Sequence, residues 1–121
     1  MPDRSAIARL TDIVEACERV RALLRCVPLE SFETDWRDQW VVERGIEIVS
    51  EASRHLPGDM KERHPQIPWP KVAGIGNVLR HNYEHVSSAI LWTLVQTELA
   101  GLEQACREEL ARELAKEHPQ S

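Results

Sequence analysis

The sequence predicts an all-α fold, an up-and-down bundle of four to five helices. Ala, Leu, Glu and Arg dominate the 121 residues, and these residues favour helix over strand. Apolar residues recur in steps of three and four, whereas β-branched residues form no alternating runs. With 42% apolar and 29% charged residues the chain can build and coat one core, so we expect residues 1–121 to form a single helical domain.

The first helix is predicted to begin at a cap supplied by Asp3 or Ser5. It should end before Pro28, because the residue that precedes a proline disfavours helical dihedral angles. Residues 28–34 are interpreted as a connection. The apolar positions of the helix form one buried stripe, which consists of Ile7, Leu10, Val14, Cys17, Val20 and Leu24.

A second helix is predicted from a cap at Thr34 or Asp35 to the break at Pro57-Gly58. Its apolar positions exceed a single stripe, so we expect it to be buried on more than one side. They are Trp36, Trp40, Val41, Val42, Ile46, Ile48, Val49, Ala52 and Leu56. The two tryptophans stand one turn apart, a spacing more typical of core or dimer contacts than of a ligand platform.

Four prolines between positions 57 and 70 predict a structured loop with at most one short turn at 59–63. His55 and His64 are interpreted as capping or surface residues rather than ligands. Trp69-Pro70 is typical of a helix entrance, with Pro70 at the first helical position. The third helix that follows should direct four apolar side chains inward, namely Val72, Ile75, Leu79 and Val86.

A fourth helix is predicted after Ser87-Ser88, with Gly101 as the site of a kink or break. Beyond it, apolar residues continue in steps of four to near the end of the chain, at Leu102, Cys106, Leu110 and Leu114.

Charge and cysteine content narrow the functional classes. The net charge of −5 argues against a nonspecific nucleic-acid binder, so any RNA contact requires a local positive patch or one assembled across a dimer. The three cysteines form no C-x-x-C pair, and no apolar run reaches membrane-spanning length. We therefore expect reduced thiols in a cytoplasmic protein that has no membrane partner.

The stretch from Gly76 to Tyr83 concentrates the side chains that can handle protons and bind anions near neutral pH. On a helix, Asn77, His81 and His85 share one face. A metal site at His81 and His85 would lack a third ligand, and position 82 is Asn where the zincin pattern has Glu, so we expect neither metal nor cofactor. The stretch can also be read as a polar helix end in which Arg80 pairs with Glu84.

A third interpretation follows from resemblance. The segments Pro65-Gln66-Ile67-Pro68-Trp69, Val72-Ala73-Gly74 and Asn77-x-x-x-His81-x-Tyr83 resemble the HepT-like members of the HEPN superfamily. These are bacterial and archaeal ribonuclease toxins that pair with a minimal nucleotidyltransferase antitoxin. The resemblance extends over nearly the whole chain, including residues 41–52 and 92–102.

The family motif is Arg, four residues, His, one residue and Tyr, commonly with Asn after the Arg. Asn77, His81 and Tyr83 match it, but Gly76 stands at the Arg position. The resemblance implies a homodimer in which Arg and His of both subunits form a metal-independent ribonuclease site. It also implies that Asn77 helps to position the phosphate and that Tyr83 accepts AMP from the antitoxin.

The missing arginine leaves two functions open. One is a ribonuclease toxin with His81 as the catalytic group, in which Arg80 replaces the lost Arg. Arg80 lies four residues after Gly76, so both share a helix face, and the absent side chain at position 76 should leave room for its guanidinium. Gly76→Arg should then restore part of the activity that Arg80→Ala removes. The other is a catalytically degenerate HEPN module that binds a nucleotide or its partner protein.

Overall fold

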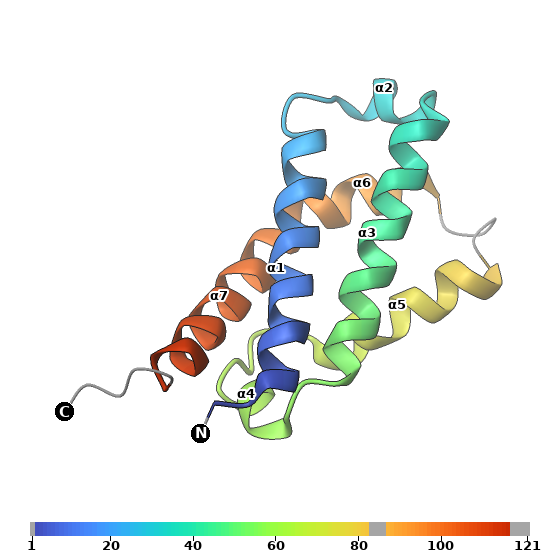
Figure 1. The fold of residues 1–121 in the computed structure, drawn as a ribbon. Helices are drawn as coiled ribbons and strands as arrows, with labels where there is room; N and C mark the ends of the chain where they lie inside the picture. Colours follow the sequence, from blue (N-terminus) through green and yellow to red (C-terminus); the bar gives the residue numbers. More distant parts are fainter. Residues whose placement is uncertain (1, 83–86, 117–121) are drawn as a thin grey trace.

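The computed structural model describes residues 2–82 and 87–116, which form seven helices and no strand (Figure 1). The all-α prediction is confirmed: five longer helices form the body, and two short helices lie in connections. The longer ones are α1 (Arg4–Leu24), α3 (Trp36–Arg54), α5 (Trp69–Asn82), α6 (Ser88–Thr97) and α7 (Leu99–Ala115). The short ones are α2 (Leu29–Glu33) and α4 (Gly58–Glu62).

Helix α1 lies between α3 and α7 and packs along both (Figure 1). Helix α5 packs mainly against α3, near the end of α3 that leads into α4, and its second half extends away from the body. Helix α6 contacts α1 and α2 and leads directly into α7. None of the helices in the described ranges is both long enough and apolar enough to span a membrane.

Side-chain caps start three of these helices, and for α1 and α3 the cap is a residue that the sequence suggested. The Asp3 carboxylate accepts the Ala6 N–H at 3.0 Å, and the Asp35 carboxylate accepts two N–H groups in the first turn of α3. Ser87 caps α6 through the Ile90 N–H at 3.1 Å. In each case the cap satisfies a backbone donor that has no partner within its own helix.

The core runs along the facing sides of α1, α3, α6 and α7 and closes over the short helix α2. Phe32 of α2 has no exposed surface, which explains why residues 28–34 form more than the simple connection that the sequence predicted. Burying one aromatic ring anchors a helix too short to be stable alone. Other core members that are fully or almost fully buried include Leu10, Ile13, Cys17, Val20, Leu24, Val42, Ile46 and Cys106.

One expectation about a helix end was wrong. The break between α6 and α7 falls at Glu98 rather than at Gly101, which lies inside α7. Leu114 at the end of α7 is 43% exposed, whereas Glu103, Glu109 and Glu113 of the same helix are buried. Trp36 and Trp40 are 55% and 66% exposed and contact each other edge to face, so they are not core residues, and the alternative of a dimer contact stays a prediction.

Candidate active site

Helix α5 carries the candidate site, and Gly76 fixes it against α3. The Gly76 N–H donates to the Ser50 hydroxyl oxygen at 3.0 Å, and the Ser50 hydroxyl donates to the Ala73 carbonyl at 2.8 Å. A Cβ added at Gly76 would lie 2.6 Å from Ser50 Oγ and 2.8 Å from Ser50 Cβ. The two helices therefore approach so closely at this point that a side chain at position 76 requires them to move apart.

This contact corrects one expectation about the missing arginine. The space beside Gly76 is occupied by Ser50, so the absence of a side chain there leaves no room for the guanidinium of Arg80. An arginine at position 76 itself would collide with α3 before it reached solvent. The glycine is thus explained by close helix packing, which the sequence pattern alone did not reveal.

After Gly76 the helix has two exposed positions followed by a buried one. Asn77 is exposed, Val78 is 40% exposed and Leu79 is buried. Asn77 and His81 stand four residues apart on α5, a spacing that places them on one face of a helix. The side chains of Arg80 and His81 lie outside the part of the chain that the structure describes.

Four predicted residues fall beyond the end of α5 in the stretch that the structure leaves undescribed. They are the proposed AMP acceptor Tyr83, the expected ion-pair partner Glu84 of Arg80, His85 and the predicted core residue Val86. The structure thus brings Asn77 and the backbone of His81 onto one helix. It does not place Tyr83.

An apolar groove lies between α5 on one side and α6 with the start of α7 on the other. Its volume is about 960 Å³. Val72, Ile75 and Val78 line one wall, and Ile90 and Leu94 line the other. Ile90 is 54% exposed, so two aliphatic side chains stand in contact with solvent on facing sides of the groove. Exposed apolar surface of this kind is typical of an interaction site.

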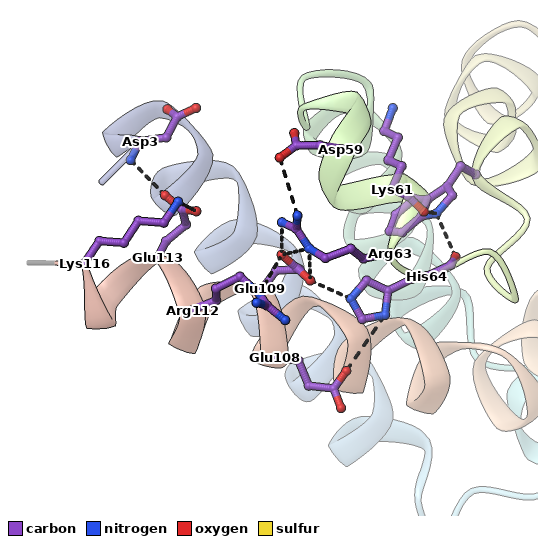
Figure 2. Close-up of polar contacts among 11 residues, drawn as sticks. Asp3, Asp59, Lys61, Arg63, His64, Glu108, Glu109, Arg112, Glu113 and Lys116 are labelled. Atoms are coloured by element: carbon purple, nitrogen blue, oxygen red, sulfur yellow. Dashed lines mark hydrogen bonds and ion pairs between the residues drawn. The ribbon is translucent and has the colours of Figure 1, made fainter. Parts of the chain in front are cut away.

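The start of α5 is held by polar contacts that sequence reasoning missed. Arg63 and His64, in the loop before α5, both bind the carboxylate of Glu109 on α7 (Figure 2). Arg63 Nη2 donates to Glu109 Oε1 at 2.7 Å, and Arg63 Nε lies 3.2 and 3.1 Å from the two carboxylate oxygens. His64 Nε2 lies 2.8 Å from Glu109 Oε2. We name Arg63, His64 and Glu109 the Glu109 clamp.

His64 is buried, with 7% of its surface exposed, so its interpretation as a capping or surface residue was wrong. The hydrogen bonds from Arg63 hold the pKa of Glu109 below its ordinary value, against the opposing effect of burial, and His64 adds to them. Glu109 is therefore ionised near neutral pH. Because an ionised carboxylate can only accept, His64 Nε2 carries a hydrogen and donates it.

Two further glutamates of α7 are buried in similar contacts. Burial raises the pKa of Glu103, but hydrogen bonds from Arg21 of α1 and from Arg107 outweigh it and hold the pKa below its ordinary value. The Asp3 N–H, followed by Lys116, lowers the pKa of Glu113. In residues 2–82 and 87–116, no group of three or more His, Cys, Asp or Glu residues is placed to hold a metal ion.

Comparison with known proteins identifies the family. Residues 13–109 match the family described as ribonuclease HepT-like. The chain is 38% identical over 93 residues to a "Probable ribonuclease HepT" of Thermococcus cleftensis, covering 77% of this chain and 84% of that protein. It is 30% identical over 99 residues to a "Putative RNase" of Methanocaldococcus jannaschii, covering 82% and 91%.

A "Putative RNase" of Caldanaerobacter subterraneus subsp. tengcongensis is 31% identical over 104 residues, covering 86% of this chain and 93% of that protein. No solved structure matches the chain. The family match and these relatives span most of the sequence, from α1 into α7, so the resemblance seen in the motif extends to the fold. The chain belongs to the ribonuclease HepT-like family.

Proposed function

We propose that this protein is the ribonuclease toxin of a toxin–antitoxin pair and cleaves RNA without a metal ion. The observation that carries the proposal is that two residues of the family motif lie on one helix: Asn77 is exposed, and His81 stands four residues later, on the same face. The match to the ribonuclease HepT-like family supports the reaction class. The names of its relatives support RNA as the substrate.

The chemistry requires few groups. RNA supplies its own nucleophile, the 2′-hydroxyl, so cleavage requires proton transfer and stabilisation of the charge that develops on phosphorus oxygens. An imidazole with an ordinary pKa of about 6.5 can accept or donate that proton near neutral pH, which is the role of His81. The amide of Asn77, exposed one turn earlier, donates to a phosphate oxygen.

A guanidinium is the group best suited to the developing charge, and Arg80 supplies it. Ser50 fills the space beside Gly76, so the guanidinium is not assigned to that space. Arg80 is adjacent to His81 in sequence, and a long flexible stem lets its guanidinium reach a phosphate held at Asn77. This revises the expected route but keeps the expected residue.

The functional unit in this proposal is a homodimer. The groove between α5 and α6 is apolar, carries the exposed Val78 and Ile90, and adjoins the helix that holds the motif. A second copy that covers this groove would place the motif helices of both subunits near one cleft. Light scattering at micromolar concentration should give the mass of a dimer; a monomer mass would count against this part of the proposal.

Regulation is assigned to Tyr83, two residues after His81. AMP added to its hydroxyl by a minimal nucleotidyltransferase would place a bulky anion beside the cleavage site and repel the RNA backbone. Co-expression with such an enzyme and measurement of intact mass should show the added AMP on the wild type. The added mass should be absent from Tyr83→Phe, and its persistence there would place the acceptor elsewhere.

The decisive experiment for cleavage compares purified wild type with His81→Ala on single-stranded RNA in the presence of EDTA. Wild type should cleave, and His81→Ala should be at least about 100-fold slower, the usual contribution of a general acid or base. Cleavage that requires added metal, or that survives in His81→Ala, would contradict the proposal.

One observation favours a second candidate function. Gly76 is needed where it is for helix packing, so the motif arginine cannot return to its position without a change in α3. A degenerate module that binds a nucleotide or a partner protein explains this equally well. The absence of cleavage by the wild type, together with nucleotide binding in calorimetry, would select it.

A further inference from the structure

The Glu109 clamp joins α7 to the segment that starts α5. Glu109 has 3% of its side chain exposed and His64 has 9%, so their contact is shielded from water. The His64 carbonyl accepts the Trp69 indole Nε1–H at 3.1 Å and the Ile67 N–H at 3.1 Å. Trp69 is the first residue of α5 and also donates to the Lys61 carbonyl. Hydrogen bonds of the His64 ring and of the His64 carbonyl together therefore link Glu109 to the beginning of α5.

The second attachment of α5 is the turn from Ala73 to Gly76, which is hydrogen-bonded to Ser50 of α3. Arg54 adds to this attachment, because its guanidinium donates to the Ala73 carbonyl at 2.8 and 3.0 Å. A stiff helix fixed at its start and at one later turn has a fixed direction. The two attachments therefore set the position of the residues of α5 that follow Gly76.

The geometry of a helix shows what loosening the first attachment would do. At ~1.5 Å rise per residue, Trp69 lies about 10 Å before Gly76 and His81 lies about 7.5 Å after it. If α5 pivots at Gly76, a shift of about 2 Å at Trp69 moves His81 by roughly 1.5 Å. A misplacement of about 1 Å can cost on the order of 100-fold in rate.

We propose that Glu109, His64 and Arg63 are positioning residues for RNA cleavage: from a different helix, they set the direction in which α5 presents Asn77 and His81. This inference rests on the proposed function for its effect on cleavage. The structural part, that the clamp controls the placement of α5, does not depend on it.

Glu109→Ala tests the clamp, and Glu103→Ala is its matched control. Both remove a buried glutamate of α7 that binds arginine, but Glu103 binds Arg21 of α1 and Arg107 of α7, away from the loop before α5. At a temperature where both variants are folded, kcat for RNA should fall about 10- to 100-fold in Glu109→Ala, with KM within about twofold. In Glu103→Ala both constants should stay within about twofold of wild type.

His64 provides a milder pair of variants should Glu109→Ala fail to fold. His64→Ala should lower kcat at unchanged KM, and His64→Gln should recover most of it, since the glutamine amide can donate to Glu109 in place of Nε2. An equal loss of kcat in both His64 variants would show that this hydrogen bond does not position α5, and would overturn the proposal.

Hydrogen exchange of the amides in residues 70–82 separates this inference from the proposed function. Exchange there should accelerate in Glu109→Ala and not in Glu103→Ala, whether or not RNA is cleaved. If wild type does not cleave RNA, the proposed function fails while exchange still decides whether the clamp holds α5. The proposal that the Glu109 clamp positions α5 would be overturned by unchanged exchange in Glu109→Ala. It would also be overturned by a loss of kcat in Glu103→Ala as large as in Glu109→Ala.

Discussion

Helices α7 and α5 are both fastened by polar groups, but by different kinds. Along α7, buried carboxylates accept hydrogen bonds from α1, from the loop before α5 and from α7 itself. Along α5, the attachment to α3 is a close approach, in which a glycine, a serine hydroxyl and a backbone carbonyl meet. One contact depends on charge and the other on the absence of a side chain.

The two kinds of contact should be sensitive to different substitutions. A buried carboxylate with several donors is costly to remove, because its partners are left without a counter-charge. A contact between small groups is weak in hydrogen-bonding energy but intolerant of added volume. We therefore expect the contacts of α7 to be destabilised by removal of a carboxylate and by acid. The contact of α5 should be destabilised by a single added methyl group.

The largest effect is expected from Glu109→Ala. It removes the acceptor of His64, which is buried, and of Arg63, which is partly exposed, and should lower the free energy of unfolding by about 3 kcal/mol. Glu108→Ala is the control: the neighbouring glutamate is 55% exposed and should change stability by less than about 0.5 kcal/mol. Urea titration measures both, and equal effects would contradict the role of the clamp.

The next effect is expected from Gly76→Ala, which should destabilise the protein by about 2 kcal/mol through collision with Ser50. Gly74→Ala is the matched control in the same helix, because a Cβ there meets no atom within 4 Å. It should stabilise by about 0.5 to 1 kcal/mol, since alanine favours helix over glycine. Adding Ser50→Gly to Gly76→Ala should recover part of the loss; if it recovers none, the collision is not the cause.

Acid should lower the stability of the fold through the glutamates of α7, by a smaller amount than these substitutions do. Glu103, Glu109 and Glu113 have folded-state pKa values below the ordinary value. Each therefore adds stability that is complete above the unfolded pKa of about 4.3 and is lost as pH falls through the folded value. Thermal melting from pH 7 to pH 3 should show a steep loss below about pH 4.5, and the loss should be shallower in Glu113→Gln. A slope unchanged by that substitution would exclude Glu113 as a contributor.

The smallest effect is expected from Ser50→Ala, which removes the hydroxyl between Gly76 and Ala73. The cost should be about 1 kcal/mol, the net value of a typical hydrogen bond, and exchange of the α5 amides should accelerate. Ser53→Ala serves as control, because the Ser53 hydroxyl donates to the Ser50 carbonyl within α3 itself. Similar exchange of α5 in both variants would argue against Ser50 as its attachment.

The helices were predictable from sequence because their caps and apolar steps are local. Asp3, Asp35 and Ser87 each act on an N–H two or three residues away, so a short window of sequence contains the whole interaction. The end of α6 was misplaced because Gly101 is tolerated inside a helix. The boundary lies at Glu98, three residues before the glycine.

The site was predictable only as far as its motif. Gly76 could be aligned with the missing arginine, but its packing on Ser50 joins residues 26 apart in sequence and leaves no local pattern. The clamp escaped notice for the same reason, since Glu109 and His64 are 45 residues apart. The only sequence pattern that pointed to these contacts was the placement of glutamates at 103, 109 and 113 on one side of α7. A solvent-exposed helix face has the same pattern.

Single-turnover cleavage of RNA by Arg80→Ala, measured beside His81→Ala and wild type, tests the central claim most directly. If Arg80 replaces the motif arginine, Arg80→Ala should lose cleavage as completely as His81→Ala. Arg19→Ala, which removes an arginine on α1 that is 79% exposed, should cleave like wild type. Cleavage by Arg80→Ala at the wild-type rate would contradict the claim that this chain has moved its catalytic arginine to position 80.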